Sequence, residues 1–186
     1  MKILVAALLG GLLSFGWNAV AHMATPLGHE GVKDLPAEPV MLAGMSAAIK
    51  EPGLYMVPGG GDEAMKTPEG EAAYAKKVVE GPSGVLVYRP TNGTVLGPKV
   101  LALEFAINVG CALVLALVIS LGRFQNFGSR FLVGGLLGAY GSISIGGSYT
   151  LWYGFPMDYT LANTVMEVVA GFVAAIPAAA MLKPRG

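Results

Sequence analysis

The chain has few charged side chains, two histidines and a single cysteine among its 186 residues. Charged residues make up 13% of it, whereas ordinary soluble domains carry about 25%. The net charge is zero, so the chain lacks the general basic field that attracts nucleic acid. The lone Cys111 excludes an internal disulfide and any metal site built from several cysteines. We therefore expect no nucleic-acid partner.

Sequence motifs for cofactor binding and for nucleophilic catalysis are also lacking. We find no P-loop, no dinucleotide-binding fingerprint and no Ser-His-Asp arrangement. Gly59-Gly60-Gly61 is not followed by the Lys and Ser/Thr of a phosphate-binding loop, so it is interpreted as a turn. We therefore expect no cofactor and favour a non-enzymatic role over an enzyme.

Long apolar runs are abundant instead, and apolar residues make up 54% of the chain. The run from Val100 to Leu121 contains one charge, Glu104. At about 1.5 Å per residue, a helix of this length crosses a hydrocarbon core of about 30 Å. Three further runs have similar character: Ile3–Ala21, Phe131–Tyr153 and Tyr159–Leu182. The sequence predicts an all-α membrane protein with a bundle of four transmembrane helices.

The first run, Ile3–Ala21, has two interpretations. A basic start at Lys2 and the small residues around Val20 resemble a signal peptide cleaved after Ala21. The apolar run is longer than a signal peptide needs and suits a spanning helix. We favour the uncleaved helix, and the cleavage of residues 1–21 stays an alternative.

The polar segment between the first two helices predicts a small α+β cap. Its Pro and Gly residues separate four short elements. Thr67 is a suitable N-cap for a helix that starts at Pro68. The expected elements are a helix over Val40–Lys50, a strand over Gly53–Val57, a helix over Pro68–Glu80 and a strand over Val85–Tyr88. The resulting organisation is helix one (1–22), an extracytoplasmic cap (23–99) and helices two to four (100–186).

The termini and the short loop on one side of the predicted helices carry basic residues and no acidic residue. Asp158 and the long polar segment lie on the other side. The residues counted on the first side are Lys2, Arg123, Arg130, Lys183 and Arg185. The positive-inside rule therefore predicts that both termini are cytoplasmic.

Polar residues inside the helices occur in pairs spaced i, i+4, so each pair shares a helix face. The pairs are Asn18 with His22, Glu104 with Asn108, Ser144 with Ser148, and Asn163 with Glu167. They predict one intramembrane polar cluster that opens to the outside. It is either a proton, cation or substrate site, or hydrogen-bonded glue between helices. No residue is assigned a catalytic role.

A metal site is a further hypothesis. The candidates are His22, His29 and Glu30, and nearby thioethers could suit copper; these are Met23, Met41 and Met45. The other interpretation is an interfacial histidine with ordinary core methionines.

Small residues recur at i, i+4 along the predicted helices and favour close helix packing. The stripes are Ala6, Gly10 and Ser14; Gly134, Gly138 and Ser142; Ala170, Ala174 and Ala178; and Gly171, Ala175 and Ala179.

Three short stretches resemble small uncharacterised four-helix proteins of bacterial inner membranes. They are Trp17-Asn18, Gly53-Leu54-Tyr55 and Val85-Leu86-Val87-Tyr88-Arg89-Pro90. The resemblance implies a multi-pass protein of the bacterial inner (plasma) membrane, and it implies no chemistry.

These observations support three hypotheses on function. The first is a structural or accessory membrane protein whose cap contacts a partner, either another membrane protein or a second copy. The second is a small ion- or proton-coupled carrier that uses Glu104 and Glu167 as a pair. The third is a metal-dependent membrane enzyme. The first leads because catalytic motifs are lacking, and the lipid bilayer is a partner in all three.

Overall fold

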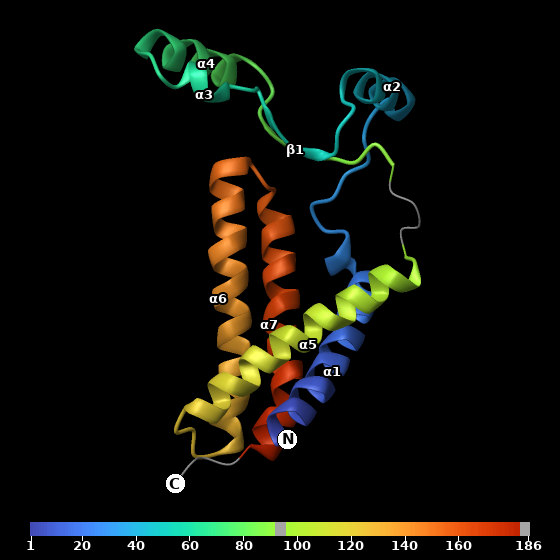
Figure 1. Ribbon diagram of the computed structural model, residues 1–186, viewed down its shortest axis with the longest axis vertical. Helices are drawn as coiled ribbons and strands as arrows, with labels where there is room; N and C mark the ends of the chain where they lie inside the picture. The colour runs from blue at the N-terminus through green and yellow to red at the C-terminus, as the bar shows by residue number, and fades with distance from the viewer. Residues whose placement is uncertain (92–95, 183–186) are drawn as a thin grey trace. The chain divides into compact units, whose positions relative to one another are not determined.

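The computed structural model describes residues 1–91 and 96–182 and consists mainly of helices (Figure 1). The elements are α1 (Lys2–Ala24), the 3₁₀ helix η1 (Pro26–Gly28), α2 (Glu38–Ala48), β1 (Gly53–Val57), α3 (Gly61–Ala64), α4 (Pro68–Glu80), β2 (Gly84–Tyr88), α5 (Pro98–Leu121), α6 (Phe127–Tyr153) and α7 (Met157–Met181). They group into two compact units. The first comprises Met1–Val32, Val95–Thr150 and Phe155–Gly186, and the second comprises Lys33–Thr94 and Leu151–Gly154.

The four predicted membrane segments are confirmed as helices that are long and apolar enough to cross a bilayer: α1, α5, α6 and α7. They indicate a multi-pass membrane protein. The first is one continuous helix of 23 residues. Pro177 lies inside α7, which continues beyond it to Met181.

The interior of the first unit is built from small residues. Ala116 and Ala175 are fully buried, and no large side chain is fully buried among the described residues. Large apolar side chains point outward instead; Leu8 is 53% exposed and Leu136 is 59% exposed. In water, such a surface would be unfavourable, whereas lipid tails solvate it well. This distribution of side-chain size therefore agrees with helices that are surrounded by lipid.

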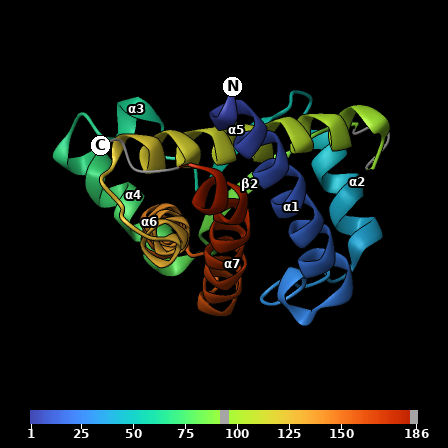
Figure 2. The same ribbon diagram turned by 90° about the horizontal axis from the view of Figure 1, so that it is seen from below.

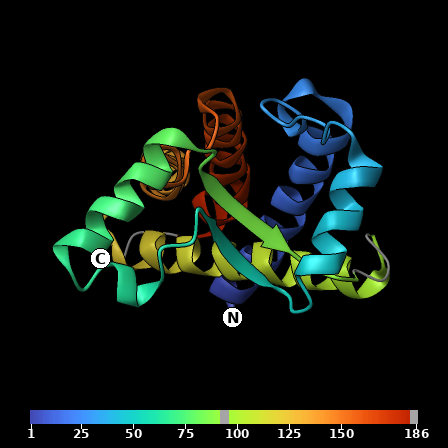
Figure 3. The same cartoon turned by 90° about the horizontal axis from the view of Figure 1, so that it is seen from above.

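Helix α7 lies between α1 and α6 (Figures 2 and 3), and α5 lies across α1 and α7. The small-residue stripes make the close contacts. A Cβ added at Gly10 would lie 2.5 Å from the carbonyl oxygen of Ala174. A Cβ at Gly134 would collide with the backbone of Gly171, and the converse also holds. The prediction that these stripes are packing faces is confirmed at these contacts.

The expected start of the third long helix, at Phe131, is wrong, because α6 begins at Phe127. Ser129 N donates to Asn126 Oδ1 at 2.8 Å, which is the hydrogen bond of an N-cap. Arg130 therefore lies inside the helix and is 8% exposed. Its guanidinium donates to the carbonyl oxygens of Phe124 (3.1 Å), Gln125 (3.2 Å) and Ala179 (2.9 Å). Arg130 is thus not the free flanking charge that the orientation argument assumed.

The second unit contains the predicted short elements (Figure 3). Strands β1 and β2 pair antiparallel, with Gly53 opposite Tyr88 and Val57 opposite Gly84. Thr67 Oγ1 accepts from Gly70 N at 3.1 Å and caps α4, as predicted. The short helix α3 begins at Gly61, the last residue of the expected Gly59-Gly60-Gly61 turn. No described residue from Lys33 to Thr91 is buried, so this unit lacks a hydrophobic core of its own in the part that the structure describes.

Candidate ligand pocket

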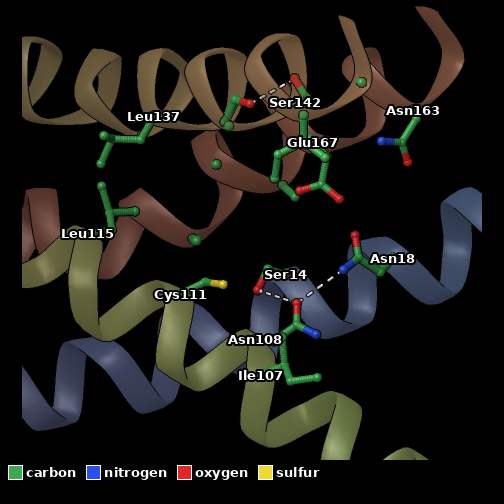
Figure 4. Close-up of a pocket in the computed structure, with 18 of the residues that line it drawn as sticks. Ser14, Asn18, Ile107, Asn108, Cys111, Leu115, Leu137, Ser142, Asn163 and Glu167 are labelled. Carbon is green, nitrogen blue, oxygen red and sulfur yellow. Dashed lines mark hydrogen bonds between the residues drawn. The ribbon is translucent and has the colours of Figure 1, made fainter. Parts of the chain in front are cut away.

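A pocket of about 650 Å³ lies within the first unit, lined by residues of α1, α5, α6 and α7 (Figure 4). Small-molecule sites in proteins usually measure about 300–1,000 Å³. The pocket is open, because the side chains of Glu104 and Glu167 on its wall remain exposed.

Helices α1 and α5 contribute a hydrogen-bonded wall centred on Asn108, which is 6% exposed. Asn108 Oδ1 accepts from Ser14 Oγ at 3.0 Å and from Asn18 Nδ2 at 3.1 Å. Asn108 Nδ2 donates to Glu104 O at 2.8 Å and to Glu104 Oε1 at 2.9 Å. Asn108 therefore joins the two helices and also fixes the side chain of Glu104.

Helix α7 contributes Asn163 and Glu167. Figure 4 shows Glu167 across the pocket from Asn18 and Asn108. Glu104 and His22 are both near enough to interact electrostatically with Glu167. No hydrogen bond joins the two glutamates in the described part of the chain, so the structure shows a shared pocket without a direct carboxyl–carboxyl bond.

The structure thus brings together five of the eight predicted polar residues: Asn18, Glu104, Asn108, Asn163 and Glu167 line the pocket, and His22 does not. The predicted pair Ser144 and Ser148 is not in the lining either. Ser148 Oγ donates within its own helix, to Ser144 O at 2.9 Å. Two residues along a helix differ in direction by about 200°, so the lining Ser142 and its neighbour Ser144 face opposite ways.

Several lining residues were not predicted from the sequence as site residues; they include Ser142, Cys111, Gly141, Tyr149 and Tyr159. One signal for Cys111 was available, because it follows Asn108 by three positions and so shares its face.

The metal hypothesis gains no support from the geometry. His22, His29 and Glu30 are exposed. The side chains that the structure describes include no group of three or more His, Cys, Asp or Glu placed to hold a metal ion. His29 follows η1, where its backbone N–H donates to Pro26 O at 3.0 Å.

Comparison with family models, with curated proteins and with solved structures gives no match for this chain. Its function therefore has to be inferred from the pocket. Two carboxylates on facing helices can hold a cation or accept hydrogen bonds from a ligand. The apolar remainder of the wall can enclose a hydrocarbon group.

Proposed function

We propose that this protein binds a small ligand between its membrane helices, as a carrier or a ligand-binding membrane protein. One observation carries the proposal: Glu104 and Glu167 converge from different helices on a pocket of about 650 Å³. Ionisable residues in membrane helices are unfavourable unless they face protein, water or a ligand, and they commonly mark functional sites. The second sequence hypothesis, which uses this pair of glutamates, is the one that the pocket supports.

The proposal includes a location and an orientation. We propose the bacterial inner membrane, with both termini in the cytoplasm, four helices forming a bundle and the second unit as an extracytoplasmic cap. Lys2 and Arg123 support this orientation; Lys183 and Arg185 lie outside the described residues.

Thiol labelling tests the orientation. Lys66→Cys and Gln125→Cys, each in a Cys111→Ala background, should react oppositely with an impermeant reagent added to intact cells. We expect labelling at position 66 alone, and labelling at position 125 alone would reverse the orientation.

Filling the pocket tests the binding function. A Cβ at Gly141 or at Gly147 would meet no atom within 4 Å, but only Gly141 lines the pocket. Gly141→Leu should therefore fill the pocket without disturbing the helices, and Gly147→Leu is the matched control on the same helix. The protein is purified in mild detergent, and small molecules extracted from it are quantified by mass spectrometry.

We expect a compound that is retained in proportion to protein by the wild type and by Gly147→Leu, and that is lost from Gly141→Leu. Equal retention by both variants, or no retained compound in the wild type, would contradict ligand binding in this pocket.

A second candidate function rests on the second unit. A two-stranded sheet without a buried face is marginally stable by itself. Leu54 and Val87 are paired across this sheet and are 62% and 67% exposed. We propose, as the first sequence hypothesis does, that this unit is stabilised by a protein partner or a second copy.

Light scattering in mild detergent tests this candidate. The doubly substituted Leu54→Ser, Val87→Ser chain should have a lower mass than the wild type, whereas Val79→Ser, at an 85% exposed position of α4, should not. A monomeric wild type would argue against a second copy.

A further inference from the structure

The charge of the pocket wall is one-sided. Two carboxylates line it, and no Lys, Arg or His does so among the residues that the structure describes. His22 interacts electrostatically with Glu167 from outside the lining, and a single imidazole cannot balance two carboxylates. A carboxylate that lacks a partner in a membrane helix is unfavourable, so a cationic ligand would stabilise the site.

The free acceptors of the wall match the donors of a primary ammonium. Among the described residues, no hydrogen bond involves the carboxylate of Glu167 or the side chain of Asn163. The carboxylate of Glu104 accepts one hydrogen bond, from Asn108 Nδ2 to Oε1. Asn108 has its donors and acceptor occupied by other residues, so it positions Glu104 and leaves the ligand to others. An ammonium group has three N–H donors. The two carboxylates and the side-chain oxygen of Asn163 can each accept one hydrogen bond from it.

The wall changes from polar to apolar along the helices. On α5, Glu104 lies towards the start of the helix and Leu115 lies about 16 Å further along its axis. On α7, Asn163 and Glu167 are followed by small apolar residues. The apolar end is lined by Val114, Leu115, Leu137, Ala170, Gly171 and Ala174. The α7 lining runs from Tyr159 to Ala174 with Glu167 near its middle, so a ligand that contacts both carboxylates can extend a hydrocarbon chain towards the apolar end.

We infer, on the basis of the proposed binding function, that the pocket takes an amphiphile with a primary ammonium group. The ammonium lies between Glu104 and Glu167, and the hydrocarbon chain extends towards Leu115 and Leu137. Anionic amphiphiles are excluded by repulsion from the carboxylates, and neutral ones leave the carboxylates without a counter-charge.

Decylamine is the probe for this inference. The full chain is placed in phosphatidylcholine nanodiscs, and radiolabelled decylamine, below its micelle-forming concentration, is measured at equilibrium against empty nanodiscs. Saturable binding of one molecule per chain is expected, with competition by unlabelled decylamine and much weaker competition by decanol.

Charge-removing variants locate the ammonium. Glu104→Gln and Glu167→Gln should each weaken decylamine binding about tenfold or more, since a hydrogen bond to a charged group is worth at least about that factor. Glutamine at position 104 can still accept from Asn108, so the wall should stay intact. Glu69→Gln, on the exposed first turn of α4, is the control and should bind as the wild type does.

The outcomes separate this inference from the binding function. Decanol competing as well as decylamine, or binding that both glutamine variants retain in full, would overturn the ammonium assignment and leave a ligand-binding pocket. Absence of saturable decylamine binding would also overturn it, and the extraction experiment with Gly141→Leu then decides whether the pocket binds any ligand.

The ammonium could belong to a free amine or to a lipid headgroup. Nanodiscs that contain phosphatidylethanolamine distinguish the two sources. If this lipid suppresses decylamine binding, the ligand is an aminolipid, and if it does not, the ligand is a free amine; the assignment of an ammonium amphiphile is supported in both cases.

Discussion

The contact between α6 and α7 at Gly138 leads to a sharp prediction on stability. A Cβ at this position would lie 3.0 Å from the carbonyl carbon of Glu167 and 3.1 Å from the Cα of Val168, and closer still to the carbonyl oxygen of Glu167. These are backbone atoms of α7, which cannot rotate away. Gly138→Ala should therefore push the two helices apart, although it adds only one methyl group.

The size of the effect follows from a matched comparison. Replacing Gly with Ala inside a helix favours the helix by about 1 kcal/mol wherever it is done. Gly147 lies on the same helix and has open space around it, so Gly147→Ala gives this gain alone. Overpacking at Gly138 adds a penalty of about 1–3 kcal/mol. The difference between the two variants should therefore be about 1–3 kcal/mol, and the helix-propensity term cancels from it.

The free energy of unfolding is measured by titrating the protein with sodium dodecyl sulfate in mild-detergent micelles. Gly138→Leu should be less stable than Gly138→Ala, and also less stable than Leu136→Ala, since Leu136 is 59% exposed. If Gly138→Ala is as stable as Gly147→Ala, α6 and α7 do not pack through this glycine, and the close-contact reasoning is refuted.

Asn108→Leu should lower the free energy of unfolding by about 1–3 kcal/mol, because two bonds from α1 are lost; Ser148→Ala, on the exposed side of α6, should change it by less than about 0.5 kcal/mol. Arg130→Ala should lower the free energy of unfolding by about 1.5–3 kcal/mol, because its bonds to carbonyl oxygens are lost. Arg123→Ala, at an exposed position, is the control and should have a smaller effect. Thr67→Ala should lower the local stability of α4 by about 1 kcal/mol, measured as faster hydrogen exchange in its first turn. Unchanged stability in any of these three would contradict the corresponding contact.

Features set by a few neighbouring residues could be predicted from the sequence. The strand Gly53–Val57 and the capped helix Pro68–Glu80 are found with the predicted bounds, because Pro, Gly and Thr act on the backbone locally. The missed start of α6 is also local. Asn126 was a suitable cap, but the expected helix was counted only from the start of the apolar run at Phe131.

The pocket could be predicted only in part. The i, i+4 spacing placed Glu104 with Asn108 and Asn163 with Glu167 on common faces, and both faces meet the pocket. Which faces of different helices meet depends on how the helices pack against one another. The sequence does not encode that packing locally, so Ser144 was expected in the cluster where the structure places Ser142.

The small-residue interior has a consequence for how this chain tolerates change. In a water-soluble domain, selection acts on polarity at the centre and permits varied side chains at the surface. In this chain the constraints differ. Buried positions such as Ala116 and Ala175 tolerate only small side chains, and exposed positions such as Leu8 require apolar ones. Exchanges among Leu, Ile, Val and Phe can then accumulate on the outside at little cost, while a single added carbon inside separates two helices. Substitution tables calibrated on soluble proteins would rank the harm of mutations in this chain in the wrong order.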